Sequence, residues 1–421
     1  MRVICLIVLV CLATAGCDGG VQPAPSDTQT IAQKARAIHE RILVLDAHAD
    51  IEIPGQLSRY AGSDGMSRIA PVKLRAGLVD AVVAAAAVGP GPRDAAGFAA
   101  ARRQADSEIA AIHAQVADVS TGTVLATSAQ AIETAHAAGE IAMILGFQNA
   151  RILGRQPSAI DEFYDAGVRV FALTHMGHND FADSSRPVFD GQTKGYEPDE
   201  EHGGLSQLGM QAIRRLNDLG AVIDISQLSR RAALQAIELS RAPVVATHSN
   251  VQALTDVRRN LSDEEIDRIG ETDGVIHVAA FRGYLFDSND KELDLRIRQT
   301  RTAHGLPQDY DYPFELYWEI ESFEDQQAYT GAISELLGAG SADVLVDHID
   351  YIVQRIGIDH VGIGNDFNHG GGIEGFVDAS GALVITEALL RRGYSEGAIA
   401  KIWGGNFLRA MRAAEAAAVV N

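Results

Sequence analysis

Hydrophobic and polar positions alternate along the chain in two ways, as short apolar runs and as longer segments with one apolar face. Segments of the second kind lie at residues 31–41, 94–117, 128–138 and 206–219 and predict helices. The apolar runs predict buried strands at residues 42–45, 79–88, 141–145, 168–173, 221–225, 244–246, 274–280 and 361–363. About eight strands separated mostly by helices predict a (β/α)8 TIM barrel.

Polar residues follow nearly every predicted strand, which bears on the choice of fold. A doubly wound sheet, the alternative, would gather its polar residues at one crevice. No glycine-rich dinucleotide fingerprint follows the early strands either. The pattern therefore favours the barrel, in which sites are built at the carboxyl ends of the strands.

The segment near residues 286–340 interrupts the alternation of strands and helices. It is charged and aromatic, with Tyr310, Tyr312, Phe314, Tyr317 and Trp318 close together. One interpretation is a surface excursion packed by its own aromatic side chains. The other is a lid over the barrel mouth, because long insertions at that face commonly shape pockets. We expect a lid from the position of the segment and no chemistry from its residues.

Composition and charge narrow the function classes. The 421 residues are 47% hydrophobic, enough for one large barrel or two ordinary domains. The chain has 35 basic and 56 acidic residues, a net charge of −21 that is spread along its length. This charge argues against nucleic acid and against an anionic membrane surface as partners.

Residues 1–17 predict an export signal. A positive residue precedes ten apolar residues and a zone of small residues, and ten apolar residues cannot span a bilayer. Residues 18–30 then read as a flexible tether, and residues 31–421 as a single barrel domain. We therefore expect an exported protein, located in the periplasm or at the bacterial envelope.

The three cysteines all lie in this export signal, so the barrel domain has no disulfide and no thiolate ligand. Cys17 follows small residues, as in a bacterial lipoprotein signal, and a lipid at Cys17 would be the only membrane contact. Ordinary cleavage after Ala15 is the competing interpretation, because Thr14 stands where the lipoprotein pattern prefers leucine.

Candidate chemistry begins in the stretch at residues 45–50. His48 and Asp50 alternate on a continuing strand, so both side chains point the same way, and the pair suits a divalent metal of the zinc type. Other strand ends carry further candidates: Gln148, His175, Gln227, His248 and Asp366. A single histidine after a strand is usually hydrogen-bonded structure, but the barrel would bring all of these ends together.

Several ordered blocks between residues 39 and 412 resemble the membrane (renal-type) dipeptidases, which are amidohydrolase-like metal-dependent hydrolases. The first blocks are Asp46-Ala47-His48-Ala49-Asp50, Leu173-Thr174-His175 and Phe181-Ala182-Asp183-Ser184-Ser185. The later blocks are Gly204-Leu205-Ser206-Gln207, Ile223-Asp224-Ile225-Ser226, Thr247-His248-Ser249-Asn250, Arg259-Asn260, Gly364-Asn365-Asp366-Phe367 and Gly404-Gly405-Asn406.

The resemblance implies a dipeptidase that uses two bridged zinc ions to activate water. His48 and Asp50 would hold the first metal and His248 the second. Asp366 would bind the substrate amino group and move protons, and His175 would polarise the scissile carbonyl. Arg259 would bind the substrate carboxylate, although its position in the sequence alone suggests an ordinary surface arginine. The family is often dimeric, so a homodimer is also an expectation.

Two positions depart from the family pattern. Gln148 stands where the family has a glutamate that bridges both metals, and Gln227 stands where it has a histidine on the second metal. A neutral amide is a weak ligand and cannot bridge two cations as a carboxylate does. We therefore expect one tightly bound Zn²⁺ at His48 and Asp50, with Gln148 as a weak ligand and Gln227 as a doubtful one.

Three functions are compatible with these residues. The first, which we favour, is a metal-dependent dipeptidase or related small-amide hydrolase. The second is a divergent envelope enzyme that acts on a peptide-like metabolite, as in siderophore maturation. The third is a catalytically silent binding protein, and the retained His175, Asp366 and Arg259 argue against it.

Overall fold

A computed structural model of the chain describes residues 30–190, 195–310, 312–314, 320 and 322–419. The predicted export signal with Cys17, and nearly all of the predicted tether, lie outside the described residues and stay predictions. Tyr317 and Trp318 of the inserted segment also lie outside them. Within the described ranges, no helix is long and apolar enough to cross a membrane.

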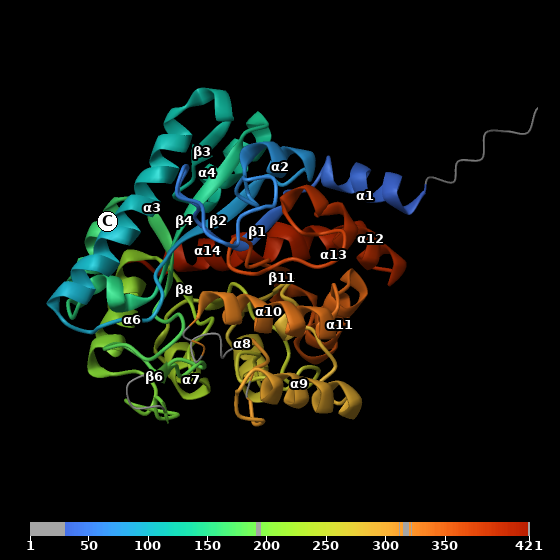
Figure 1. Cartoon of the computed structure of the whole chain (residues 1–421). Helices are drawn as coiled ribbons and strands as arrows, with labels where there is room; N and C mark the ends of the chain where they lie inside the picture. The colour runs from blue at the N-terminus through green and yellow to red at the C-terminus, as the bar shows by residue number, and fades with distance from the viewer. Residues whose placement is uncertain (1–29, 191–194, 311, 315–319, 321, 420–421) are drawn as a thin grey trace, which may run out of the picture.

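Eight parallel strands form a nearly closed barrel at the centre of the molecule (Figure 1). Asp50 N donates to Phe367 O at 2.9 Å and Asp366 N donates to His48 O at 3.0 Å, which joins the last strand to the first. The predicted (β/α)8 barrel is thus confirmed. In order around the barrel, the strands are β1 (Leu45–Asp50), β2 (Ala81–Ala87), β4 (Ile141–Gln148), β5 (Val168–Ala172), β8 (Val222–Asp224), β9 (Val245–Ala246), β10 (Val275–Val278) and β11 (Val361–Ile363).

Two strands differ from the sequence prediction. The apolar run places the first strand at residues 42–45, whereas β1 begins at Leu45 and carries His48 and Asp50 within it. Polar and apolar residues alternate along β1, so no continuous apolar run marks it in the sequence. The second difference is β3 (Thr123–Leu125), a strand too short for a periodic signal, which pairs with the start of β4. A separate two-stranded sheet contains β6 (Phe189–Asp190) and β7 (Gly195–Tyr196).

Helices surround the barrel, and many begin at a side-chain cap. Asp94, Ser128 and Ser206 each accept a hydrogen bond from the backbone N–H three residues later, which stabilises the first turn. The helices are α1 (Ile31–His39), α2 (Pro71–Ala76), α3 (Ala95–Ala117), α4 (Ala129–Ala138), α5 (Ile160–Asp165), α6 (Gln207–Leu219), α7 (Arg230–Leu239), α8 (Asp263–Glu271), α9 (Lys291–Ala303), α10 (Phe323–Leu337), α11 (Ala342–Ile356), α12 (Leu383–Arg391), α13 (Glu396–Ala400) and α14 (Asn406–Ala417).

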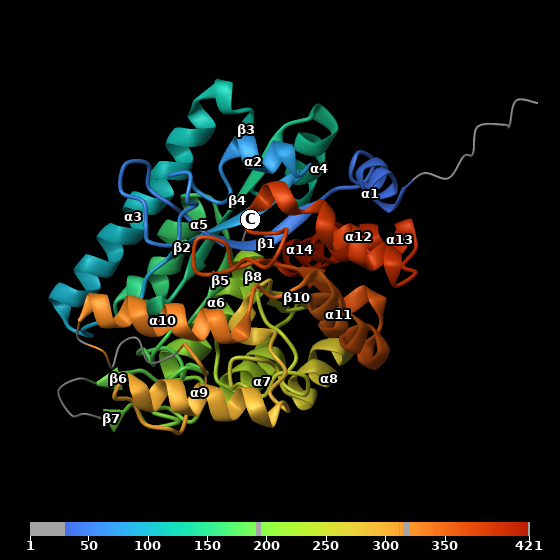
Figure 2. The same ribbon diagram turned by 45° about the vertical axis from the view of Figure 1, so that its right-hand side comes forward.

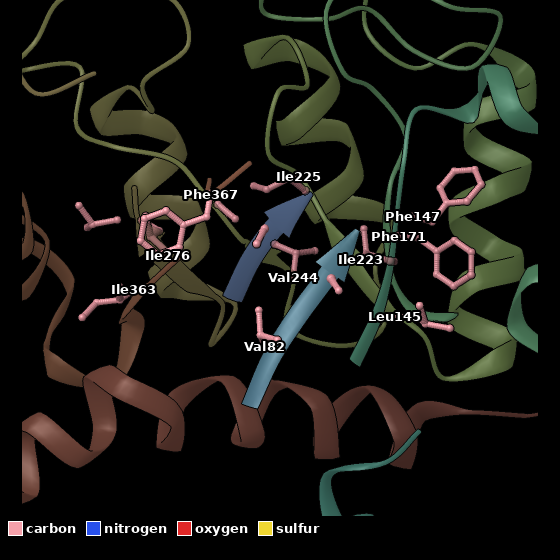
Figure 3. Packing of buried hydrophobic residues seen from close by; sticks show 14 of the residues in the cluster. Val82, Leu145, Phe147, Phe171, Ile223, Ile225, Val244, Ile276, Ile363 and Phe367 are labelled. Carbon is pink, nitrogen blue, oxygen red and sulfur yellow. The ribbon is translucent and has the colours of Figure 1, made fainter. Parts of the chain in front are cut away.

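The strands are buried on both faces, as in parallel barrels generally. Val83 and Ile144 pack in the barrel interior, in one cluster with Phe407 of α14. Val82 and Leu145, their neighbours in sequence, point the other way and pack with residues of the surrounding helices. Figure 3 shows part of this outer layer of the core, including Val82, Leu145, Phe147 and Phe171.

The inserted segment contains α9 and α10, which lie together beside the barrel (Figure 2). Tyr312 and Tyr329 are buried in a core cluster of their own with Tyr284. Tyr312 also lines a cavity together with Thr330 of α10 and His369, which follows β11. The segment therefore has its own aromatic core and also lines a cavity beside the loop that follows β11, while its role in chemistry stays a prediction.

Candidate metal centre and substrate cavity

The carboxyl ends of the strands bring the predicted ligand residues together. His48 and Asp50 come from β1, and Gln148 is the last residue of β4. His248 lies two residues after the end of β9, and one of its ring nitrogens lies within 4.8 Å of a ligand atom of His48 and of Asp366. All five side chains are buried or nearly so. The barrel thus assembles a group that could hold a metal ion.

The backbone is strained at two of the site residues. Gln227 has φ +66° and Asp366 has φ +59°, a left-handed conformation that side chains other than glycine rarely adopt. Such strain costs about 1–3 kcal/mol per residue and is concentrated at functional sites. The conformation at Asp366 is supported by its neighbour, because Asn365 Nδ2 donates to Asp46 Oδ2 of β1 at 2.9 Å.

One hydroxyl group orients both histidines of the centre. The rings of His48 and His248 stack with centroids 3.7 Å apart. Thr247 Oγ1 lies 2.8 Å from His248 Nδ1 and 3.3 Å from His48 Nδ1, and it donates to Asp224 Oδ2 at 2.5 Å. Since its only proton goes to the carboxylate, the hydroxyl accepts from the Nδ1–H groups. Both rings then present the Nε2 lone pair to the site, as metal-binding histidines do.

The two glutamines face His248. Gln148 Nε2 lies 3.3 Å and Gln227 Nε2 lies 3.2 Å from His248 Nε2. Two amide donors therefore share the lone pair that would otherwise bind a metal. Burial, followed by the nearby charges of His48 and Arg259, holds the pKa of His248 well below its usual range. This part of the centre is neutral.

The chemistry of the donor atoms fits a metal ion. Four of the side chains predicted as ligands each keep one buried atom without a hydrogen-bond partner among the described residues. These atoms are His48 Nε2, Asp50 Oδ1, Gln148 Oε1 and Gln227 Oε1. An unsatisfied buried polar atom is costly, so a cluster of them calls for a ligand. Imidazole, carboxylate and amide oxygen are all ligands of divalent metals.

His369 belongs to the centre and was missed by the sequence analysis. Its Nδ1 lies 2.9 Å from Asp50 Oδ2, and its ring packs edge-on against His175 with centroids 4.7 Å apart. Burial alone would raise the pKa of Asp50, but His369 and His48 outweigh it and hold that pKa well below the usual range. His369 lies three residues after Asp366 in a glycine-rich loop. This position was the only indication in the sequence that it could belong to the centre.

His175 lies at the edge of the centre, close to the predicted position for a substrate carbonyl. Its Nδ1 is 3.2 Å from Val88 O, so the Nδ1–H donates to that carbonyl and Nε2 is left as an acceptor. Burial, with the nearby His369 and Arg186, holds the pKa of His175 well below its usual range. The ring could therefore polarise a carbonyl only after a second proton binds at Nε2. Negative charge that develops on the substrate would favour this protonation.

Arg259 is buried, whereas its position in the sequence alone suggests a surface residue. It donates to His248 O at 2.6 Å and to Ser249 Oγ at 2.9 Å, and its Nε has no partner among the described residues. Its charge acts on both His248 and Asp366. A guanidinium held in this way can still offer donors to a carboxylate.

The carboxyl group of Asp366 lies next to the two stacked histidines, with one of its oxygens within 4.8 Å of a ring nitrogen of His48 and of His248. Burial and the charge of Asp50 raise its pKa, and His369, His48 and Arg259 oppose that shift. A buried carboxyl with a raised pKa close to a metal group is suited to holding and releasing a proton.

Comparisons with known proteins identify the family of the chain. The family profile described as membrane dipeptidase (peptidase family M19) matches residues 32–421. Dipeptidase aclJ of Aspergillus oryzae is 29% identical over 277 residues, which cover 66% of this chain and 52% of aclJ. The chain thus spans about half the length of the first curated relatives that it matches.

Solved structures are similar over nearly the whole barrel. The crystal structure of the probable dipeptidase PvdM from Pseudomonas aeruginosa has a TM-score of 0.81 and 35% identity, and the match covers 92% of this chain and 99% of PvdM. A metallopeptidase of Rhodobacter sphaeroides, solved with a phosphinate mimic of the dipeptide L-Ala-D-Ala, has a TM-score of 0.64 and 19% identity. That match covers 89% of this chain and 99% of the metallopeptidase, and it shows the fold alone.

Proposed function

Because this chain belongs to the membrane dipeptidase family, peptidase family M19, we propose that it is a metal-dependent dipeptidase or a hydrolase of a related small amide. The observation that carries the proposal is the cluster of buried ligand atoms without partners at the carboxyl ends of the strands. His175, Arg259 and Asp366 lie close to this cluster and would be the groups that bind and cleave a dipeptide. The export signal predicted at residues 1–17 would place the reaction in the periplasm or at the bacterial envelope.

The metal ion and three side chains would each have a separate role in hydrolysis. A bound metal ion would supply a water molecule of lowered pKa and polarise the scissile carbonyl. Asp366 would bind the substrate amino group and move a proton between the attacking water and the leaving amine. His175 would donate to the carbonyl oxygen as negative charge develops on it. Arg259 would bind the terminal carboxylate with its planar fork.

We further propose that the ion is Zn²⁺ and that one ion is bound tightly, at His48 and Asp50. The supporting observation is that His248 faces two neutral amides instead of a carboxylate and a histidine. Without a bridging charge, the repulsion between two neighbouring cations is poorly compensated in a buried site. Amide oxygens of Gln148 and Gln227 could complete the coordination of one ion but would hold a second ion weakly.

The test is hydrolysis of a dipeptide panel by the metal-loaded protein, by the protein after chelation, and after addition of Zn²⁺ back. We expect activity that is lost on chelation and restored by the ion. Metal-dependent activity on peptide-like metabolites but on no dipeptide would favour the divergent envelope enzyme, the second candidate. The two glutamines at ligand positions are the observation that keeps this second candidate open. Binding of such compounds without turnover would favour the silent binding protein.

The role of Arg259 can be tested separately. Arg259→Ala should cost about 2–5 kcal/mol in transition-state binding, the range for losing one partner of a buried charge pair. Arg259→Lys should restore only part of this, because an ammonium cannot make the two-pronged contact. The measurement is kcat/KM on dipeptides with free and amidated C-termini. An equal loss on both would show that Arg259 does not bind the carboxylate.

A further inference from the structure

A cavity of about 330 Å³ beside the metal centre is lined by arginines. Arg59, Arg68, Arg186 and Arg282 all border it, together with aromatic side chains and His369. No aspartate or glutamate is found among the described residues that line it. In a chain with a net charge of −21, four arginines that line one cavity are a marked departure from the average composition.

The charges of two of these arginines are not neutralised by ion pairs. Arg68 Nε donates to Tyr60 O at 2.7 Å, and Arg282 donates to Gly338 O at 3.0 Å and to Ser334 Oγ at 3.4 Å. Neither guanidinium forms a salt bridge within 4.0 Å to any carboxylate of the described ranges. Burial lowers the pKa of both groups, and at Arg68 this outweighs the opposing effect of the nearby carboxylates of Asp378, Asp64 and Glu52.

The arginine cavity adjoins the metal centre. A smaller cavity of about 200 Å³ is lined by Asp50 and His175 of the centre and by the carboxylates Glu52 and Glu108. His369 lines both cavities, as do Tyr60 and Met176. A substrate held at the metal centre can therefore extend past His369 into the arginine cavity, which has the opposite charge.

We propose that the arginine cavity binds an acidic side chain of the substrate, so that this enzyme prefers dipeptides containing a residue of the glutamate type. The proposal rests on the proposed function and adds the substrate class. The terminal carboxylate is already assigned to Arg259, so Arg68 and Arg282, which form no ion pair with a described carboxylate, imply a second negative group. A carboxylate matches the planar guanidinium fork, and the aromatic walls pack against the methylene groups of the side chain. The competing view is that these arginines only attach the inserted segment to the barrel.

The test compares each acidic dipeptide with its amide counterpart, which has the same shape but no charge. The Kd, from calorimetry on the metal-loaded full chain, and kcat/KM are measured for Ala-Glu against Ala-Gln and for Glu-Ala against Gln-Ala. We expect about a tenfold or larger preference for glutamate in at least one pair, the scale of a partly buried charge interaction. Equal values within both pairs would overturn the proposal.

Variants then locate the preference. Arg59→Gln and Arg282→Gln should each reduce the preference for glutamate, and the double variant should nearly remove it. Arg59 is exposed, so its variant is expected to fold even if Arg282→Gln loosens α10. The matched control is Arg169→Gln, because Arg169 donates to the backbone carbonyls of Thr127, Tyr164 and Val168 and is not among the described residues that line the cavity. It should leave the preference unchanged.

The outcomes separate this proposal from the proposed function. If no dipeptide is hydrolysed, the proposed function fails, while the Kd values still decide whether the cavity selects an acidic side chain. If dipeptides are hydrolysed without a preference for glutamate, the cavity proposal fails and the proposed function stands. A preference for glutamate that survives the double variant would also overturn it, because the selectivity would then arise elsewhere.

Discussion

The metal centre consists of two groups of side chains, the β1 half and the β9 half, which lie at the same end of the barrel but differ in charge. The β1 half contains His48, Asp50 and His369, in which a carboxylate lies between two imidazoles at 3.4 and 2.9 Å. The β9 half contains His248, Gln148 and Gln227, in which an imidazole lies between two neutral amides. The comparison shows that the fold brings these side chains to the carboxyl ends of the strands, but their charges determine how tightly a cation binds there.

The pKa shifts of the two halves follow the same division. Burial opposes charge in both halves. At Asp50 the neighbouring histidines outweigh burial, and the carboxylate stays charged. At His248, burial and the surrounding cations act in the same direction, and the ring stays neutral. A divalent ion therefore gains a full negative charge at the β1 half and only dipoles at the β9 half.

The largest expected effect is the loss of a ligand from the β1 half. His48→Ala should remove the metal and abolish dipeptide hydrolysis, a loss of several kcal/mol of transition-state stabilisation. His248→Ala should spare most of the metal, because the ion is held mainly by His48 and Asp50. Metal content per chain, measured by mass spectrometry after gel filtration, distinguishes the two variants. Equal metal loss in both would show that the halves contribute alike.

The next expected effect is a gain of metal binding and of activity when the β9 half receives a carboxylate. Gln148→Glu together with Gln227→His should recruit a second tightly bound ion and raise the rate of dipeptide hydrolysis. Each single change should do less, because the bridging and terminal ligands act on the same ion. Metal titration of the unmodified protein and of the three variants provides the measurement. Two tightly bound ions in the unmodified protein would contradict this account, as would a double variant without a second ion.

Much of this centre could be predicted from the sequence because its residues stand at strand ends. Gln148 and His248 end or follow apolar runs, and a barrel brings such positions together. The family blocks then added roles that position alone could not give. The family itself is confirmed by the matched profile.

The remainder could not be predicted because it depends on contacts between distant loops. His369 is three residues beyond Asp366, and it reaches Asp50 in a loop with left-handed residues at Asp366 and Asn368. The burial of Arg259 depends on its bonds to His248 and Ser249, which hydrophobic periodicity does not report. The arginine cavity is assembled from the loop after β1, the segment after β10 and α10, which are far apart in sequence.

A smaller effect is expected from His369, which supports the β1 half without being predicted as a ligand. His369→Gln removes the imidazole whose Nδ1 lies 2.9 Å from Asp50 Oδ2 and orients that carboxylate, and it should lower metal affinity about 10–100-fold, the usual range for a residue that orients a ligand. Competition with a chelator of known affinity gives the value. His360→Gln is a matched control, since His360 bonds only to the backbone oxygen of Gly274. An unchanged affinity in His369→Gln would remove His369 from the centre.

The smallest expected effect concerns Glu108, a carboxyl group on α3 that borders the β1 half. Its oxygens accept from Ala87 N at 2.9 Å and from Gln104 Nε2 at 3.0 Å. Burial raises the pKa of Glu108 from the ordinary value of 4.5 to about 8, and the charge of Asp50 adds to the shift. The folded protein therefore binds this proton more tightly than the unfolded chain does.

The sign of the pH dependence follows from this shift. Between pH 4.5 and about 8 the folded state holds the proton that the unfolded state has lost, so the stability contributed by Glu108 falls as pH rises through that window. The free energy of unfolding of the metal-free protein, minus that of Glu108→Gln, should decrease by at most about 1.4 kcal/mol per pH unit. Urea unfolding at several pH values measures the difference. An ion at the β1 half offsets the charge of Asp50 and lowers the pKa of Glu108, so the slope should become smaller when the metal is bound. A slope that is the same with and without the ion would place the ion away from the β1 half.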